Sequence, residues 1–406
     1  MAGRDVPLAG RIVIALDALR RKPALAKPNR PVDLVLDGRF ERAVRLRQRL
    51  YAEHRRDYGC QNASHVVNSF LMGKQDYTTK CRGLSLLSGG LDSQLAVCVL
   101  REAGADVEAV TFETPFFAAD AARKAAAALD VKLHVVDFTD DEIALVKCPP
   151  HGFGGAMNPC IDCHATMIRR AGEMMSDFGY EFVATGEVLN QRPMSQNKQS
   201  LGVVERSSGL AGRLVRPLCA RLLEPTIPEL EGRLDRSKLL ALSGRRRDPQ
   251  MELARHFGLV DYPSPAGGCK LTEKAFGRKL KDLLEHEGLD DRRLVELLNA
   301  GRRFRLPDGT SVILGRDAAD NRLLAARRAP SETILAPVSV PGPTALIPRI
   351  ASETDLETAC RIVCSWSKFD AYPGEIAVKI VTDAGTEERI VPRPYLRAPF
   401  LQFQLT

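Results

Sequence analysis

One ten-residue segment constrains the fold of this chain more than any other. Residues 84–93 read Leu-Ser-Leu-Leu-Ser-Gly-Gly-Leu-Asp-Ser, an apolar run that is broken by two glycines. The run Leu84–Leu87 predicts a buried parallel strand, and apolar residues at helical spacing in Gln94–Arg101 predict a helix. Gly89 and Gly90 lack a Cβ atom, so the backbone between strand and helix can approach a ligand closely. The segment therefore predicts a strand–loop–helix unit with a binding loop at its bend.

This loop has the features of a phosphate cradle. Ser88 and Ser93 add hydroxyl groups, and the following helix presents free N–H groups and the positive end of its dipole. The segment has neither the Gly-Lys-Ser/Thr ending of a Walker loop nor the Gly-x-Gly-x-x-Gly of a dinucleotide-binding fold. A plain strand–turn–helix corner with a glycine bend is the alternative.

Strands and helices alternate after this loop. Strands are expected at Val107–Phe112, Val131–Phe138 and Tyr180–Thr185, and helices at Ser93–Ala103, Ala118–Leu129, Asp140–Lys147 and Cys163–Phe178. Such alternation predicts an α/β fold with a doubly wound parallel sheet. Ligands bind outside the carboxyl ends of the strands in these sheets. The phosphate loop and Thr185-Gly186-Glu187 both follow strands, so we expect them to share one crevice.

The chain divides into three expected parts: 1–80, 81–300 and 301–406. Residues 1–80 carry a net charge of +8 and include a basic helix at Arg42–Arg56, whereas residues 81–200 carry −6. A basic arm beside an acidic catalytic segment fits a polyanionic partner, although a solvated basic tail is the alternative. Further helices are expected at Leu234–Leu242, Met251–Phe257, Lys274–His286 and Asp291–Leu298. The last part is expected to be α+β, with one helix at Asp355–Ser365 and a proline-rich loop at Ala329–Pro343.

The composition places the protein in the cytoplasm. A chain of 406 residues with 44% hydrophobic and 27% charged residues is typical of a globular protein of two or three domains. No apolar run is long enough for a membrane helix, and Met1–Gly10 does not read as a signal peptide. Ten cysteines are many for a cytosolic chain, where structural disulfides are rare. We therefore expect metal or sulfur chemistry at some of them.

Three cysteines could hold a cluster. Cys160 and Cys163 form a Cys-x-x-Cys at a helix start, which would bring two thiols together and lower their pKa. Cys269 lies in a Pro/Gly loop about a hundred residues later. Three thiolates with an open position suit a [4Fe–4S] cluster better than structural zinc, which usually takes four ligands, and His164 is a doubtful fourth. An ordinary redox or packing dithiol is the alternative.

Ser-Gly-Gly-Leu-Asp-Ser resembles the PP-loop of the ATP pyrophosphatases, which cleave ATP to AMP and pyrophosphate while adenylating a substrate. The resemblance implies an adenine nucleotide alpha hydrolase-like fold, with Asp92 acting beside the phosphates on the magnesium side. The residues implied to contact the nucleotide are Ser88, Gly89, Gly90, Leu91, Asp92, Ser93, Thr111, Phe112, Thr185 and Gly186.

A narrower resemblance covers residues 84–290. Asn158-Pro159 followed by Cys163, and the later Ala184-Thr185-Gly186, resemble segments of the tRNA thiouridylases, whose catalytic cysteine falls on Cys163. Cys160 departs from that pattern. It resembles instead the branch of tRNA thiolation enzymes in which Cys-x-x-Cys and a distant cysteine hold a [4Fe–4S] cluster.

The carboxy-terminal part resembles the NFACT-R type of RNA-binding domain. Gly315-Arg316-Asp317 and the later Ser365–Lys368 stand where that family has Gly-Arg-Asn and Tyr-Ser-Lys, so Asp317 and Trp366 depart from the pattern. Arg316 and Lys368 could contact phosphate, and Trp366 could stack on a base. The alternative, a core aromatic, is the preferred interpretation of Trp366.

Together these features predict an ATP-dependent tRNA sulfurtransferase that adenylates a base carbonyl and replaces its oxygen with sulfur. Sulfur would come through a cluster on Cys160, Cys163 and Cys269, or through a persulfide on Cys163 that Cys160 or Cys269 resolves. The residues expected to contact RNA are Arg192, Lys198, Arg316 and Lys368, with the run Arg245–Arg247 as a further candidate.

The expected partners are ATP with Mg²⁺, tRNA, and a sulfur donor that is either sulfide or a sulfur-carrier protein. A homodimer is compatible with this interpretation, and no membrane contact is expected. Two other functions stay open: a PP-loop ligase or amidase that acts on a small molecule, and a non-catalytic RNA-binding protein.

Overall fold

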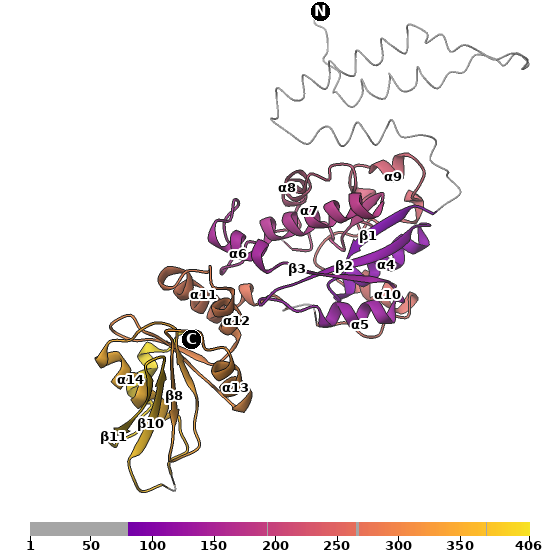
Figure 1. Ribbon diagram of the computed structural model, residues 1–406. Helices are drawn as coiled ribbons and strands as arrows, with labels where there is room; N and C mark the ends of the chain where they lie inside the picture. Colours follow the sequence, from indigo (N-terminus) through magenta and orange to yellow (C-terminus); the bar gives the residue numbers. More distant parts are fainter. Residues whose placement is uncertain (1–79, 193, 265–267, 371) are drawn as a thin grey trace, which may run out of the picture. The chain divides into compact units, whose positions relative to one another are not determined.

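The computed structural model describes residues 80–192, 194–264, 268–370 and 372–406 (Figure 1). The described residues belong to one compact unit, residues 78–406. The expected basic arm and its helix at Arg42–Arg56 lie outside the described residues. The division of the remainder into 81–300 and 301–406 stays a prediction.

A five-stranded parallel sheet forms the first half of the described chain. Its strands are β1 (Arg82–Leu86), β2 (Asp106–Glu113), β3 (Leu133–Asp137), β4 (Phe182–Ala184) and β5 (Leu214–Val215). They lie in the order β3-β2-β1-β4-β5, and each neighbouring pair is parallel. The strand order reverses between β1 and β4, which is where such sheets bind ligands.

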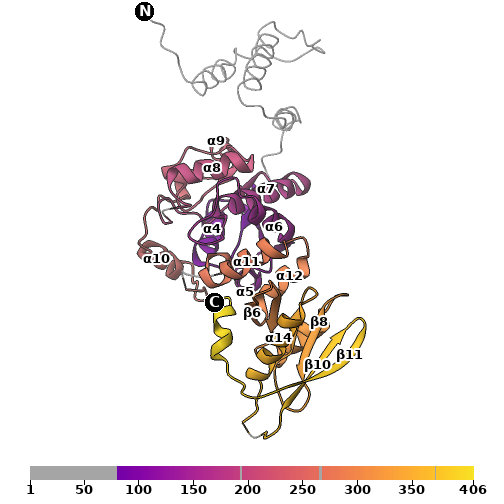
Figure 2. The same ribbon diagram turned by 90° about the vertical axis from the view of Figure 1, so that its left-hand side faces the viewer.

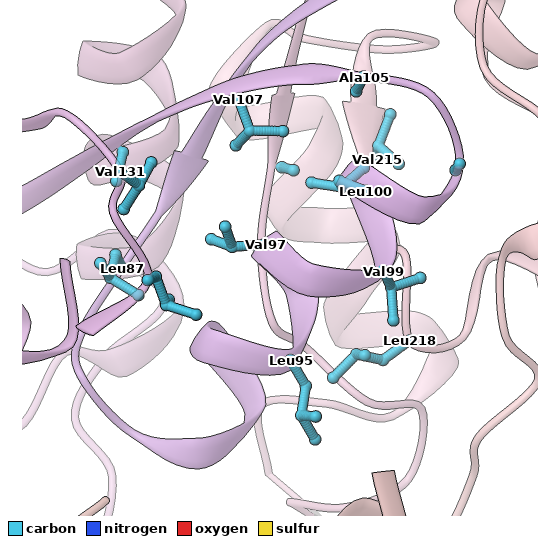
Figure 3. Close-up of a cluster of buried hydrophobic side chains, with 14 of the residues drawn as sticks. Leu87, Leu95, Val97, Val99, Leu100, Ala105, Val107, Val131, Val215 and Leu218 are labelled. Carbon is cyan, nitrogen blue, oxygen red and sulfur yellow. The ribbon is translucent and has the colours of Figure 1, made fainter. Parts of the chain in front are cut away.

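Helices cover both faces of this sheet (Figure 1). The helices are α4 (Leu91–Glu102), α5 (Asp120–Ala128), α6 (Thr139–Lys147), α7 (Cys160–Phe178), α8 (Lys198–Ser208), α9 (Ile227–Leu230) and α10 (Asp248–His256). One buried cluster joins α4 and α5 to the sheet, and Figure 3 shows several of its residues, among them Leu95, Val99 and Val107. A second cluster packs Ile168 of α7 and Val204 of α8 against Leu84. The doubly wound α/β fold is thereby confirmed.

The carboxy-terminal part is α+β, as expected. Its six strands are β6 (Arg302–Arg305), β7 (Ser311–Leu314), β8 (Thr333–Pro337), β9 (Ala345–Ile347), β10 (Ile376–Thr382) and β11 (Gly385–Val391). They form an antiparallel sheet in the order β11-β10-β8-β9-β7-β6. Its helices are α13 (Ala318–Ala326) and α14 (Glu353–Ser365), and α14 packs on β8, β10 and β11 (Figure 2).

Two helices and several 3₁₀ turns complete the described chain. The helices are α11 (Lys274–His286) and α12 (Arg292–Glu296), and the turns are η1 (Ala220–Leu222), η2 (Arg236–Lys238), η3 (Lys270–Thr272), η4 (Leu297–Asn299) and η5 (Ala398–Phe403). One buried cluster contains Phe116 from the loop after β2, Leu280 of α11 and Ile313 of β7. A continuous apolar core therefore joins the two sheets through α11.

Two sequence expectations are wrong. The helix expected at Leu234–Leu242 is only η2, because Leu239 turns to an extended backbone and Leu234 and Leu239 are both buried. The loop expected at Ala329–Pro343 contains β8, an inner strand. The prolines fall outside the strand or at its last residue, so the amides from Thr333 to Ala336 stay free for pairing.

None of the helices in the described ranges is long and apolar enough to cross a membrane.

Candidate functional site

The phosphate loop, residues Ser88–Ser93, leaves its helix terminus open to a ligand. Gly90 is the N-cap of α4 and supplies no side chain to the first-turn amides. The Ser93 hydroxyl donates to the carbonyl oxygen of Gly90 at 2.8 Å, and Ser88 Oγ lies 3.3 Å from Ser93 Oγ. The hydroxyls therefore brace the loop, and the amides of Leu91 and Asp92 are placed to receive an anion.

Gly89 is required by the backbone. Its φ is +82°, and a Cβ atom there would lie 2.3 Å from the carbonyl carbon of Ala121. The loop thus presses directly on the first turn of α5, and only glycine allows this approach. Gly90 differs, because a Cβ there would meet only the Ser88 hydroxyl, at 3.5 Å.

The segments that follow the two strand ends lie against each other. A Cβ on Gly186 would lie 2.7 Å from the carbonyl carbon and oxygen of Asp92 and from the amide nitrogen of Ser93. The segment after β4 therefore touches the backbone of the phosphate loop. The structure brings Thr185 and Gly186 to residues 88–93, as the sequence predicts.

Asp92 stands at the centre of a polar group with unused hydrogen-bonding capacity. Its Oδ2 accepts from Gln191 Nε2 at 2.9 Å, and its Oδ1 lies 3.9 Å from an Nη2 of Arg247. Asp92 Oδ1, Gln191 Oε1 and Arg247 Nε are buried, and none of them has a hydrogen-bond partner among the residues that the structure describes. A free carboxylate oxygen suits Mg²⁺, and a free guanidinium N–H suits phosphate. The residues therefore fit ATP with its magnesium ion.

Two further side chains lie beside Asp92. Gln191 was not expected here, and Arg247, a candidate RNA contact in the sequence, has its side chain 3.9 Å from Asp92; its neighbour Arg246 is exposed and pairs with Asp248. Gln191 lies 99 residues from Asp92. Its place just after Thr185-Gly186-Glu187 was the signal that could have found it.

Thr111 and Phe112 lie on β2, directly before its last residue, Glu113. Both are buried, and the Phe112 ring packs edge-on against Phe138 at 5.3 Å between centroids. The Phe112 ring is thus part of the core, and only its backbone could reach a nucleotide. Their role in nucleotide binding stays a prediction.

The three cysteines come close to one another. Cys160 is the first residue of α7, Cys163 lies one turn further, and Cys269 is the N-cap of η3. Burial raises the pKa of Cys163 well above its usual value, and the negative charges of Glu142, Cys269 and Cys160 raise it further. Burial likewise raises the pKa of Cys269 to about 11. The expectation of a lowered pKa is wrong for Cys163, because desolvation and nearby anions outweigh the helix terminus.

Glu142 of α6 is a buried acid that the sequence analysis did not identify. It is 1% exposed, and neither carboxylate oxygen has an N–H or O–H donor within reach. Burial raises its pKa to about 7, and the facing Cys163 thiol and the charge of His164 offset this only in part. A carboxyl group that gains and loses a proton near pH 7 therefore lies against Cys163.

The described residues contain no preformed set of ligands for a single metal ion. Throughout the described ranges, no group of three or more His, Cys, Asp or Glu side chains is arranged to hold one. This arrangement therefore favours neither zinc nor a cluster. The donor chemistry of three neighbouring thiols still suits iron and sulfide, and binding them would require these high-pKa thiols to lose their protons.

A buried ion pair connects the cysteine helix to the crevice. Glu187 accepts from Arg216 Nε at 2.9 Å and from the Thr185 hydroxyl at 3.0 Å, and its other oxygen lies 3.4 Å from His164 Nδ1. Burial opposes the ionisation of Glu187, but the charge of Arg216 and the His164 contact lower its pKa to about 2. The residue next to Cys163 is thus tied to the strand end beside the phosphate loop.

The expected RNA contacts lie in two places. Arg192 and Lys198 are exposed on the segment that follows β4. Arg316 is engaged by Asp320, and Lys368 is exposed near the end of α14. The Trp366 ring packs against Phe304 at 5.4 Å, which favours the core interpretation. RNA contact by these residues stays a prediction.

Two segments of the chain match family models. Residues 78–222 match the model described as thiamine biosynthesis protein (ThiI), and residues 301–398 match the NFACT protein RNA binding domain. The first segment contains the phosphate loop, Cys160, Cys163 and the end of β4. Both resemblances seen in the motifs are confirmed for these segments.

Curated relatives carry names from tRNA thiolation. A "probable tRNA sulfurtransferase" of Thermoanaerobacter sp. (strain X514) is 32% identical over 150 residues, which are 34% of this chain and 37% of that protein. A "tRNA-specific 2-thiouridylase MnmA 1" of Syntrophus aciditrophicus (strain SB) is 25% identical over 239 residues, 53% of this chain and 58% of that protein. The chain therefore spans from just over a third to less than two thirds of these relatives.

A solved 4-thiouridine synthetase–RNA complex with bound ATP aligns at 20% identity and a TM-score of 0.31, over 53% of this chain and 52% of that chain.

Proposed function

We propose that this protein is an ATP-dependent sulfurtransferase that replaces a carbonyl oxygen of a tRNA base with sulfur. The names of the curated relatives and the match to an RNA-binding domain support the substrate class. One observation carries the proposal: Gly186 packs on the phosphate loop while Glu187, the next residue, contacts His164 beside Cys163. Nucleotide and sulfur chemistry are thereby brought to one crevice.

ATP would bind with its phosphates on the amides of the loop Ser88–Ser93. Asp92 would hold the magnesium ion, which neutralises phosphate charge, and Arg247 would contact a phosphate oxygen with its free Nε. The base oxygen attacks the α-phosphorus of ATP, pyrophosphate leaves, and the oxygen becomes part of a good leaving group, AMP. The open helix terminus and the unpartnered polar atoms support this assignment.

Sulfur would reach the adenylated carbon from the cysteines. A [4Fe–4S] cluster held by Cys160, Cys163 and Cys269 would supply an open iron that binds sulfide. In the alternative, the outer sulfur of a Cys163 persulfide attacks that carbon and AMP leaves with the original oxygen. Cys160 or Cys269 then attacks the Cys163 sulfur, which releases the thiolated base and leaves a disulfide. Sulfide would be the donor for the cluster route. The persulfide route would need a sulfur-carrier protein that already bears a persulfide, which transfers its outer sulfur to Cys163 without an added oxidant.

The test is anaerobic incubation of the full chain with tRNA, ATP and Mg²⁺, once with sulfide and once with a persulfide-bearing sulfur carrier, followed by mass spectrometry of the nucleosides and assay of AMP. We expect a sulfur-containing nucleoside together with AMP that forms only when tRNA is present. AMP formation without tRNA would favour a small-molecule ligase or amidase. Binding of tRNA with neither product would favour a non-catalytic RNA-binding protein.

A further inference from the structure

The segment formed by η3 and α11 is strongly basic. Residues 270–281 contain five basic side chains and a single acidic one, Glu273. Lys281 is paired with Glu285 across one helical turn. The remaining basic residues, Lys270, Lys274, Arg278 and Lys279, are named here the α11 basic face.

The helix that carries this face is held firmly by its apolar side. Phe276, Leu280 and Leu283 are buried in the core shared by the two sheets. Lys274 and Arg278 are exposed on the helix, one turn apart, and neither makes an ion pair to any residue that the structure describes. Like charges at this spacing repel each other. A rigid helix therefore presents two uncompensated positive charges to solvent.

More positive charge lies beneath the helix. Lys279 is half-buried, and burial together with the charges of Arg303 and Arg316 lowers its pKa. Arg303 is fully buried, and the only hydrogen bond of its side chain, within the part of the chain that is described, is a 3.3 Å contact from Nη2 to the carbonyl oxygen of Leu294. Its Nε and Nη1 have no partner. Lys279 and Arg303 therefore have no ion-pair partner in the described ranges, whereas Arg316 is paired with Asp320.

This positive region borders the cysteines. Lys270 directly follows Cys269, and a Cβ on Gly277 would lie 3.6 Å from Met157, in the segment that leads to Cys160. Lys270 Nζ donates to the side-chain oxygen of Asn299 at 2.5 Å. The basic segment therefore begins directly after Cys269 and packs against the segment that leads to Cys160.

We propose that the α11 basic face binds backbone phosphates of the RNA substrate and thereby sets the position of the target base at the cysteines. The inference rests on the proposed function, because it names where the RNA of that reaction docks. Phosphate contacts fix the register and orientation of a nucleic acid without reading its sequence. A basic helix that begins five residues after Cys269, with only the turn η3 between them, is suited to that task.

The experiment compares full-length wild type with the double variant Lys274→Gln and Arg278→Gln. Its matched control is Arg221→Gln with Lys238→Gln, two exposed basic residues outside the segment matched to the RNA-binding domain that make no ion pair within the described ranges. Affinity for tRNA is measured across a salt series. The α11 variant should bind roughly tenfold more weakly at low salt, and its slope of log affinity against log salt should fall by about 1.5, the share of two phosphate contacts. ATP affinity should not change.

The charge-conserving variant Lys274→Arg with Arg278→Lys separates charge from folding, and it should restore tRNA affinity. If wild type binds tRNA and the α11 variant matches its control, the inference is overturned while the proposed function stands. If wild type itself does not bind tRNA, both are overturned. Failure of the charge-conserving variant to restore binding would also contradict a phosphate contact.

Discussion

Glycine backbone builds the phosphate loop, whereas buried side chains from three separate segments build the cysteine group. At the loop, Gly89 and Gly186 allow chain segments to approach closely, and the groups that we expect to face a ligand include amides within six consecutive residues. At the cysteines, α6 supplies Glu142, α7 supplies Cys163, and Cys269 comes from more than a hundred residues later. A site made of backbone is therefore visible in a short motif, while a site made of side chains depends on the whole fold.

The largest expected effect is the loss of bound iron when one of the three cysteines is replaced. If they act as one ligand set, protein purified without oxygen should contain about four iron atoms, and Ala at Cys160, Cys163 or Cys269 should each remove nearly all of it. Cys360→Ala is the control, because Cys360 is buried in the core of the carboxy-terminal sheet. Iron and acid-labile sulfide are the quantities to measure. Stoichiometric zinc without sulfide would contradict the cluster and leave the persulfide route.

The ion pair between Glu187 and Arg216 should contribute strongly to the free energy of unfolding. A carboxyl whose pKa falls from 4.5 to about 2 on folding contributes about 3 kcal/mol above pH 4.5. Because the folded-state pKa is the lower one, this contribution is lost as the pH falls from 4.5 towards 2.

Glu187→Gln should therefore lower the free energy of unfolding by about 3 kcal/mol at pH 7 and flatten its decline in acid. Glu388→Gln, at an exposed carboxylate of β11, should change it by less than about 0.5 kcal/mol. Urea unfolding at pH 7 and pH 3 measures both. Equal effects of the two variants would show that the Glu187–Arg216 pair does not stabilise the fold.

Two adjacent glycines of the phosphate loop should lose different amounts of stability on replacement by alanine. Gly89→Ala places a methyl group against the Ala121 backbone at a positive φ, so we expect a loss of about 2–3 kcal/mol. Gly90→Ala has room and an ordinary φ of −70°, and should cost about 0.5 kcal/mol. Thermal unfolding distinguishes them. Similar losses would mean that the loop does not depend on the close approach to α5.

What the sequence predicted follows the same division. The strand–loop–helix unit, the parallel sheet and the pairing of Thr185-Gly186 with the loop were predictable, because each depends on local periodicity or on strand ends meeting at one edge. Gln191 and Arg247 were not placed at Asp92, since that contact joins residues 99 and 155 positions apart. Glu142 carries no local signal, because nothing within α6 reveals that Cys163 will cover it. The β8 strand was mistaken for a loop because prolines were counted without their position in the strand.

The measurement that tests the account most directly is the yield of thiolated nucleoside, of AMP and of pyrophosphate from the same reaction in two variants. Asp92→Ala acts at the loop and should lower all three products at least about 100-fold, the loss typical of removing a preorganised electrostatic group. Cys163→Ala acts at the other site and should abolish the thiolated nucleoside, whereas tRNA-dependent release of pyrophosphate, which accompanies adenylation, should continue. Wild type should give one thiolated nucleoside for each AMP. Thiolation that persists without Cys163, or AMP formation that persists without Asp92, would contradict the division of the chemistry between these two regions.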